Sequence, residues 1–516
     1  MSKMIFWNKL RSFLFLLLIC CSAALQAQVT SSPYSRYGLG DFQFNGFAQN
    51  LGMGAGGIGM RNDSLLPQYI NLANPASLSS NNVVAYEVGM QSNTVRLRNT
   101  SDQSIFNRST LSHIGMAFPV AKWWSASIGL VPYSSVGYSV SNTEQHDTLG
   151  AVTYRYEGSG GISQVFSGHA VRPFAGLTGR YKNSETYELL LAKNDTAALR
   201  KALRLRSHLA NISLGAQVSY LFGPLSNVRR DIFPDSSYML NTKITRTTLV
   251  HDVYANYGIQ YRFRLAKIVN PKYRQLKKDA DSLFCGKNRG DNYFTYKSHP
   301  DSSCNRKEPL RIRDVKGDKG LQVSFGAVFA LPMSVRATSD LLGQTYRLNG
   351  GFEVFKDTIY NQSDVSGRLG LPAMAGFGFA LKQDYRWQFQ ADYAMQMWEN
   401  FNFLGEETDL RNSQRFTAGL QIQPKSGGRK DYLGNVQYRV GFRYYQTYLE
   451  LKGNRLTEYG VTMGLGFPAL NLTRVNLGLE LGRRGTTENN LIQEDYIRVM
   501  LGISINDRWF QRPKYD

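Results

Sequence analysis

Long apolar runs are almost missing from this chain of 516 residues. One such run, Phe13–Cys21, lies near the N-terminus, and no later segment offers the roughly 20 consecutive apolar residues that a membrane-spanning helix needs. The sequence therefore argues against a helical membrane protein. Its mean hydropathy of −0.33 suits a soluble protein, but it also suits a transmembrane β-barrel, in which alternate strand residues alone must be apolar.

Residues and motifs that carry chemistry are also scarce. The six histidines are scattered without the spacing of metal ligands, so we expect no metal site. The chain contains no nucleophile elbow, HExxH motif or Walker loop, which argues against an enzyme. Gly54–Gly59 matches the glycine pattern of dinucleotide sites, but no strand–helix–strand pattern surrounds it. We therefore expect no cofactor and interpret these glycines as a tightly turning segment.

The N-terminus has the features of an export signal. Basic residues precede the apolar run and small residues precede a predicted cut after Ala27, so we interpret residues 1–27 as a signal peptide. Cys20 and Cys21 leave a lipoprotein as the alternative, although Ile19 is not the small residue that lipidation requires before the cysteine.

The abundant residues indicate strands. Glycine (48), tyrosine (30) and phenylalanine (28) are typical of curved sheets and of the aromatic girdles of membrane barrels. From Trp387 to Trp398 apolar and polar side chains alternate with period 2, which indicates a strand with one apolar and one polar face. The same pattern recurs at 253–263, 436–443, 475–481 and 497–505.

A soluble β-sandwich would alternate in the same way. The strands here are long, often about ten residues or more against the usual five or six, and their apolar faces carry many aromatics. We therefore predict an all-β fold, a single transmembrane antiparallel β-barrel of about 14 strands. The strands are expected at 83–98, 108–119, 124–139, 151–171, 211–222, 241–264, 320–337, 365–382, 386–398, 412–424, 435–450, 456–468, 473–484 and 494–507.

The polar faces of these strands carry glutamines, arginines and acids, which suits a wet lumen. The simplest interpretation is that water and opposite charges satisfy the hydrogen bonds and charges of these side chains, since nothing identifies any of them as catalytic. The residues expected to face the lumen are Asp252, Gln260, Arg262, Gln388, Gln390, Asp392, Arg439, Arg443, Glu480 and Arg498.

Residues 28–82 carry a resemblance to a known family. Ser32–Asp41 reads Ser-Pro-Tyr-Ser-Arg-Tyr-Gly-Leu-Gly-Asp, a glycine-rich stretch follows, and Asn71–Leu78 contains Asn-Pro-Ala directly before the first strand. This pattern resembles the long-chain fatty-acid transporter family of outer-membrane proteins (FadL-like), in the form common among Bacteroidetes. The resemblance implies a 14-stranded barrel at 83–516 whose segment 28–82 folds inward as a hatch.

The resemblance also implies a route for a hydrophobic ligand, which would leave sideways near a kinked third strand. Pro132 lies in the third predicted strand, and proline removes a ladder hydrogen bond, so Pro132 is the candidate kink. A harmless bulge is the alternative. Aromatic residues of the hatch are expected to line the ligand path or, as the favoured alternative, to anchor the hatch. The hatch residues of interest are Phe42, Phe44, Phe47, Asn74, Pro75 and Ala76.

Two partly helical, basic inserts exceed what a minimal barrel needs. The insert 172–209 has a net charge of +5 and the insert 267–319 a net charge of +7. The second contains Cys285 and Cys304, for which the oxidising exported compartment predicts a disulfide, with two free thiols as the alternative. Both inserts follow even-numbered strands and are expected in the periplasm.

A basic periplasmic surface would engage an acidic protein partner, peptidoglycan or lipid headgroups, and solvated loops are the alternative. If the strand count is off by one, the inserts face outward and would meet lipopolysaccharide. Nucleic acid is not an expected partner of an exported barrel.

Two functions follow. The leading hypothesis is passage of hydrophobic small molecules across the outer membrane by passive, hatch-gated diffusion. The rival hypothesis is an accessory structural barrel within a larger outer-membrane complex that exports or assembles proteins.

Overall fold

The computed structural model describes residues 32–43, 46–61, 68–100, 102–177, 196–234, 238–268, 319–383, 386–424, 432–469 and 472–507. The predicted signal peptide, Phe44, Cys285 and Cys304 lie outside these ranges, and so does the predicted disulfide. Among the described residues, no helix is long and apolar enough to cross a membrane.

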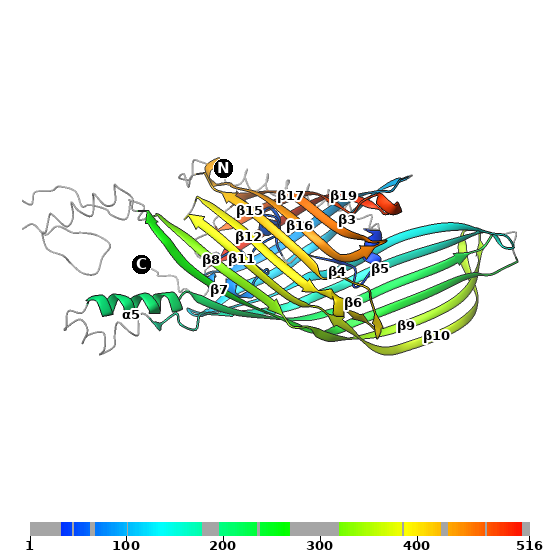
Figure 1. Cartoon of the computed structure of the whole chain (residues 1–516), viewed down its shortest axis with the longest axis horizontal. Coiled ribbons are helices and arrows are strands. Elements are labelled where there is room, and N and C mark those ends of the chain that lie inside the picture. The colour runs from blue at the N-terminus through cyan, green and yellow to red at the C-terminus, as the bar shows by residue number, and fades with distance from the viewer. Residues whose placement is uncertain are drawn as a thin grey trace, which may run out of the picture.

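Fourteen antiparallel strands of the described chain close a barrel, which confirms the predicted fold class (Figure 1). Each strand pairs with its neighbours along the chain, and β19 closes on β2. The barrel strands are β2 (Val84–Arg98), β3 (Gln103–Ala121), β4 (Trp124–His146), β5 (Gly150–Val171), β6 (Ile212–Ile232), β7 (Asn241–Ile268), β8 (Lys319–Ala330), β11 (Ala373–Gln383), β12 (Trp387–Met397), β15 (Ser413–Ile422), β16 (Gln437–Leu451), β17 (Asn454–Pro468), β18 (Thr473–Arg484) and β19 (Gln493–Asp507).

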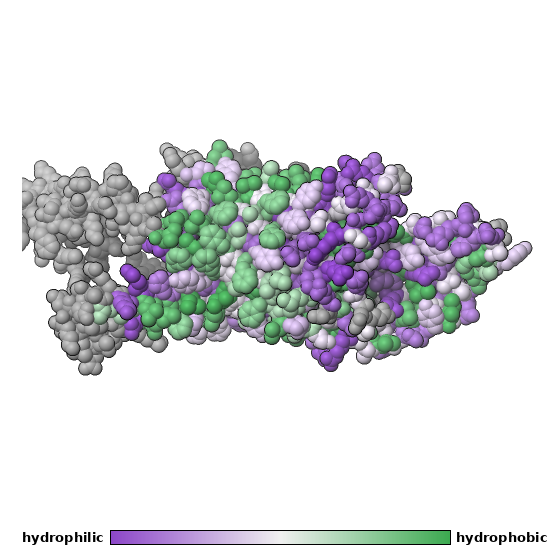
Figure 2. Space-filling model, viewed as in Figure 1, coloured by the Kyte–Doolittle hydropathy of each residue, from purple (hydrophilic) through white to green (hydrophobic). Residues whose placement is uncertain are grey.

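The barrel is apolar outside and polar inside. Phe325 and Phe416 are exposed on the outer face, whereas Gln390, Arg443 and Glu480 are fully buried. Figure 2 shows hydrophobic surface gathered over the wall that contains β8, β11, β12 and β15. A polar interior surrounded by an apolar outer band is the arrangement of a barrel that spans a membrane.

One side of the barrel continues into a tall extension, here called the lobe (Figure 1). It consists of β9 (Met333–Asn349), β10 (Phe352–Leu371) and the outer halves of β4 to β7. β8 ends before Pro332 and β11 begins after Pro372, because proline cannot donate to a ladder. β7 therefore pairs first with β9 and then with β8.

The predicted strands at 320–337 and 365–382 each cross one of these prolines. The structure breaks both strands at Pro332 and Pro372 and extends them into the lobe as far as Asn349 and Phe352. The outer half of β10 is exposed on both faces, so it has no apolar alternation that would reveal a strand.

The short turn at 122–123 lies at the end of the barrel opposite the lobe, because β4 starts there and runs into the lobe. By strand parity, both inserts leave the barrel from that same end. Helix α5 (Thr196–Leu209) lies there, so the first insert is partly helical, as the sequence indicated (Figure 1). The second insert is outside the described residues except at its two ends.

The N-terminal segment lies inside the barrel and is called the hatch, as above. Its elements are η1 (Pro33–Arg36), β1 (Asp41–Phe42), α2 (Ala48–Leu51) and η2 (Pro75–Ser80). Every residue from Phe47 to Arg61 is buried. The remaining short elements lie in loops between strands: η4 (Trp398–Asn400), β13 (Asn402–Phe403), β14 (Glu406–Glu407), η5 (Leu433–Asn435) and η6 (Glu488–Asn490).

Candidate functional site

The Asn-Pro-Ala motif fixes the hatch to the wall. The Asn74 Oδ1 accepts a hydrogen bond from Ala76 N at 3.0 Å and so caps η2, while Pro75 occupies the first helical position, where it loses no bond. The Asn74 Nδ2 donates to carbonyls of the hatch and of two wall strands, at 3.0 to 3.3 Å.

Glycines of the wall make room for this motif. A Cβ at Gly258 would overlap the Asn74 side chain, and a Cβ at Gly215 would overlap the backbone of Ala76. These two glycines face each other across β6 and β7. The motif therefore docks where neighbouring strands present no side chain, which explains part of the high glycine content.

Interior polar residues also bind the hatch backbone. The Gln390 Nε2 donates to the Met53 carbonyl at 2.8 Å, and the Gln260 Nε2 donates to the Ile58 carbonyl at 2.8 Å. The Asp392 Oδ2 accepts from Gly57 N at 2.5 Å and from Ile58 N at 3.1 Å. At this level these side chains contact protein rather than an open lumen, and they hold the hatch in place.

A second interior cluster surrounds a buried arginine. The Arg443 Nη2 donates to Glu480 at 2.5 Å and to Glu458 at 2.6 Å, and Arg498 reaches Glu480 at 2.9 Å. Tyr496 also donates to Glu458, at 2.9 Å. Four adjacent strands, β16 to β19, are thus crosslinked by charge-assisted hydrogen bonds.

The other residues expected in the lumen are spread out. Gln388 and Arg439 are buried, and the Arg439 Nε donates to Gln421 at 2.8 Å. Arg262 is half-buried. Asp252 lies closer to the lobe and pairs with Arg336 of β9 at 3.3 Å, so it belongs to neither cluster.

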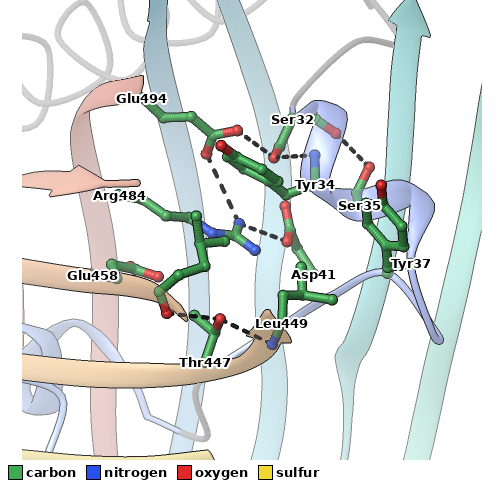
Figure 3. Close-up of polar contacts among 12 residues, drawn as sticks. Ser32, Tyr34, Ser35, Tyr37, Asp41, Thr447, Leu449, Glu458, Arg484 and Glu494 are labelled. Atoms are coloured by element: carbon green, nitrogen blue, oxygen red, sulfur yellow. Dashed lines mark hydrogen bonds and ion pairs between the residues drawn. The ribbon is translucent and has the colours of Figure 1, made fainter. Parts of the chain in front are cut away.

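A latch of four residues, Ser32, Asp41, Arg484 and Glu494, ties the start of the hatch to the last two strands (Figure 3). The Ser32 Oγ donates to Glu494 at 2.5 Å, and the Arg484 Nη1 binds Asp41 at 2.7 Å and approaches Glu494 to 3.8 Å. Tyr34 lies beneath the Arg484 guanidinium, and burial raises the pKa of its hydroxyl to about 12.

Sequence reasoning missed this latch. Its partners are separated by more than 440 residues, and no short motif links them. Ser32 before Pro33 does form the serine–proline start of a short helix, and this was the local signal that the segment is ordered.

The wall is incompletely paired between β3 and β4, at a place called the seam. β3 pairs with β4 from Ala121 back to Ile114, whose partner is Leu130, and the two strands pair no further. β3 continues beside β2 and β4 continues beside β5, each to its far end. Pro132 lies just above the last pair, at a register shift between β4 and β5.

The hatch fills the seam next to Pro132. β1 pairs antiparallel with β4 through Phe42↔Ser134 and Asp41↔Ser135, and Gln43 N donates to the Tyr133 carbonyl at 3.0 Å. A Cβ at Gly40 would overlap the Ser135 carbonyl, and Gly40 has φ +88°, so this approach needs glycine.

The space left at the seam is small. The cavity beside Pro132 measures about 20 Å³, and its lining includes Gln43, Phe47, Gln91 and Val131. It has room for about one water molecule. Beside Pro132 the seam is therefore closed by the hatch and not by β3.

Two of the hatch aromatics have anchoring contacts. The Phe42 ring lies 5.0 Å from the ring of Trp398 and 5.4 Å from that of Tyr133. Phe47 stacks on His113 at 3.7 Å between ring centroids. Above this level an apolar cluster joins Leu39 of the hatch to side chains of the lobe and barrel.

No group of histidine, cysteine and acidic residues that could hold a metal occurs within the described ranges. The chemistry of the site is that of packing, hydrogen bonding and strand pairing.

The sequence matches the family model BamG over residues 9–181 and 313–516. No curated protein matches it. Among solved structures, it is similar to the CymD monoaromatic hydrocarbon channel, with a TM-score of 0.47 and 11% identity over 91% of this chain and 100% of the other.

It is also similar to the toluene transporter TodX of Pseudomonas putida, with a TM-score of 0.46 and 12% identity over 91% and 100% of the two chains. It is similar as well to a FadL homologue of Pseudomonas aeruginosa, with a TM-score of 0.46 and 9% identity over 90% of this chain and 98% of the other. The predicted resemblance to FadL-like proteins is met in part, since such structures are among the similar ones while the matching family model is BamG.

Proposed function

The chain belongs to the BamG family, and from this premise we propose that it is a hatch-filled outer-membrane barrel that serves as an accessory structural subunit of a larger complex. That complex would export or assemble proteins. In this role the barrel positions partners and performs no chemistry of its own.

The filled interior is the observation that carries this proposal. From Phe47 to Arg61 the hatch is buried, and Gln260 of β7 and Gln390 and Asp392 of β12 bind its backbone from two different strands. Passage of a solute through this interior would need the hatch to move aside, whereas a structural subunit needs no such movement. An interior occupied by a hydrogen-bonded hatch suits a scaffold better than a pore.

The two ends of the barrel offer surfaces for partners. At the short-turn end, α5 displays the exposed basic residues Lys201 and Arg204, and the basic second insert leaves from that same end. Most membrane barrels keep short turns in the periplasm, so we place the inserts there, facing acidic protein partners. The lobe would face outward, near lipopolysaccharide.

Affinity purification from native membranes tests the proposal. The full chain should retain a defined set of partner proteins, and forms lacking 172–209 or 267–319 should lose part of that set. Lys201→Glu with Arg204→Glu is the sharper version, with Lys201→Gln and Arg204→Gln as the matched control. An identical partner set for all forms would remove the support for the subunit role.

A second candidate function, passage of hydrophobic small molecules, is favoured by the seam. The wall is unpaired above Pro132, and the apolar cluster at Leu39 reaches the hatch from the lobe side. An apolar molecule held there would leave through the seam if the hatch withdrew. Fatty-acid-like ligands remain the predicted class.

Uptake of a fluorescent fatty acid into liposomes tests this second function. The intact protein and a form lacking residues 32–82 should differ in rate. Equal rates, or no uptake by either form, would count against transport and would leave the subunit role untouched.

A further inference from the structure

The lobe is a sheet with two outer edges, and only one of them is irregular. β10 forms the first edge, and its ladder with β9 has three register shifts. Asp364, in the last of them, has φ +58°. Bulges of this kind are how native sheets prevent foreign strands from adding to an exposed edge.

β4 forms the other edge and has no such protection. From Ser134 to His146 its ladder with β5 runs without a register shift. On the opposite side its pairing with β3 stops at Leu130, and β1 covers Ser134 and Ser135. Among the described residues, no strand pairs with that side of β4 from Ser139 to Gln145.

The orientation of the free backbone groups follows from those already bound. The carbonyls of Tyr133 and Gly137 accept hydrogen bonds from the hatch, and Gly137 N donates to the Ser35 Oγ. Backbone groups of alternate residues point to the same side of a strand. The N–H and carbonyl groups of Ser139, Ser141, Thr143 and Gln145 therefore face the seam, where these residues are exposed.

We propose that this edge, Ser139–Gln145 of β4, binds an extended segment of a second polypeptide chain as an added antiparallel strand. The inference rests on the proposed function, because a complex that handles other polypeptides supplies such a segment. β1 and Ser32 are already seated on the same edge in this way, so the added strand would continue an existing interface.

The chemistry of the edge favours a polypeptide over an apolar ligand. Ser139, Ser141, Asn142 and Thr143 surround the free amides with hydroxyl and amide groups. Main-chain hydrogen bonds of this kind do not depend on the sequence of the incoming strand. The edge would therefore accept varied segments, while the neighbouring hatch prevents an added strand from sliding downward.

Binding of a defined peptide to the full-length protein in lipid nanodiscs tests the proposal. The probe is a fluorescein-labelled peptide of residues 493–507, an alternating strand of this same barrel, and the control peptide carries proline in place of Leu501. Thr143→Pro removes an N–H that faces the seam and leaves the β5 ladder intact, which an edge strand tolerates. Thr143→Ala is its matched control.

We expect fluorescence anisotropy to show binding by the wild type and by Thr143→Ala, with a loss of about tenfold or more in Thr143→Pro. Ser141→Pro should reproduce the loss. The shift in gel mobility between unheated and heated samples checks that each variant has a folded barrel. A photo-crosslinker at position 143 should capture the peptide, whereas one at position 360 on the bulged edge should not.

Failure of the wild type to bind would overturn the proposal, and so would equal binding by Thr143→Pro and Thr143→Ala. If a fatty acid prevents the crosslinker at position 143 from capturing the peptide, the seam would be assigned to an apolar ligand instead. An identical partner set for all forms in the affinity purification, together with intact peptide binding, would contradict the proposed function and leave this inference standing.

Discussion

The barrel wall has two junctions that differ in how fully they are paired. β19 and β2, the last and first barrel strands, pair from Gln493↔Arg98 to Asp507↔Val84 with no register shift. β3 and β4 are joined by a tight turn, yet they separate after Ile114↔Leu130. Closeness in sequence therefore does not decide where the wall closes, and the weak junction lies where the hatch supplies a strand.

The difference shows what the hatch does for the wall. An unpaired edge inside a membrane leaves backbone groups without partners, and each such group is costly in hydrocarbon. β1, Gln43 and Ser32 satisfy β4 just above Pro132. The hatch thus fills the lumen and also completes the wall, so release of the hatch and opening of the seam should be coupled.

Breaking the latch should have the largest effect on this coupling. Arg484→Met leaves the buried Glu494 and the half-buried Asp41 without their cation, and loss of one partner costs about 3–5 kcal/mol in comparable buried pairs. Hydrogen exchange should rise in β1 and in Tyr133–Gly137 of β4, and β2 should stay protected. Arg483→Met, which removes an exposed pair with Asp495, is the control and should cost at most about 1 kcal/mol. Equal exchange in the two variants would show that the latch does not hold the seam.

Crowding the Asn-Pro-Ala motif should have the next largest effect. In Gly258→Val the new side chain overlaps Asn74, and overpacking of this kind costs about 1–3 kcal/mol. The hatch should become accessible to protease, and single-channel conductance should increase in planar bilayers. Ala255→Val, on the same strand but not on its buried face, is the control. A protease-resistant hatch in Gly258→Val would mean that the motif is not what retains it.

The sequence predicted the barrel well, because its evidence repeats along every strand. Each of the predicted strands corresponds to one barrel strand, since the outward apolar face forces alternation wherever lipid is the neighbour. The length of the lobe strands was underestimated for the same reason. Where β10 is exposed on both faces, the alternation disappears although the strand continues.

The site was harder to predict than the fold. Asn74, Pro75 and Ala76 stood out as a short motif, and Pro132 stood out as a proline within a strand. Arg484 and Glu494 carried no such sign, because their partners Asp41 and Ser32 lie at the opposite end of the chain. Contacts of that separation follow from barrel closure and cannot be read from any local window.

Restoring a backbone donor at the seam should have a smaller effect. Pro132→Ala gives β4 an amide where the pairing with β3 has just ended, and one hydrogen bond is worth about 1 kcal/mol. Hydrogen exchange in β3 should slow at Ser112 and His113, next to the last existing pair, because β1 already occupies β4 from Ser134 onward. Pro224→Ala, within β6, is the control for a proline substitution away from the seam. Unchanged exchange in β3 would show that Pro132 is a harmless bulge.

The bulged edge of the lobe, formed by β10, should respond to pH. Burial alone would raise the pKa of Glu353, but hydrogen bonds from Lys243 and Arg230, both at 2.7 Å, hold the pKa of this β10 carboxyl below its ordinary value. The stability that ionised Glu353 gives to the folded state is therefore complete above the pKa of this group in the unfolded chain. It is lost as the pH falls through the lower pKa of the folded state. Because the Glu353 side chain is about a quarter exposed, we expect its protonation to destabilise the lobe by less than about 1 kcal/mol. Hydrogen exchange in β10, corrected for intrinsic rates, should rise between pH 6 and strongly acidic pH in the wild type. In Glu353→Gln it should already be raised at pH 6 and change little, and an equal pH response in that variant would assign the effect to another group.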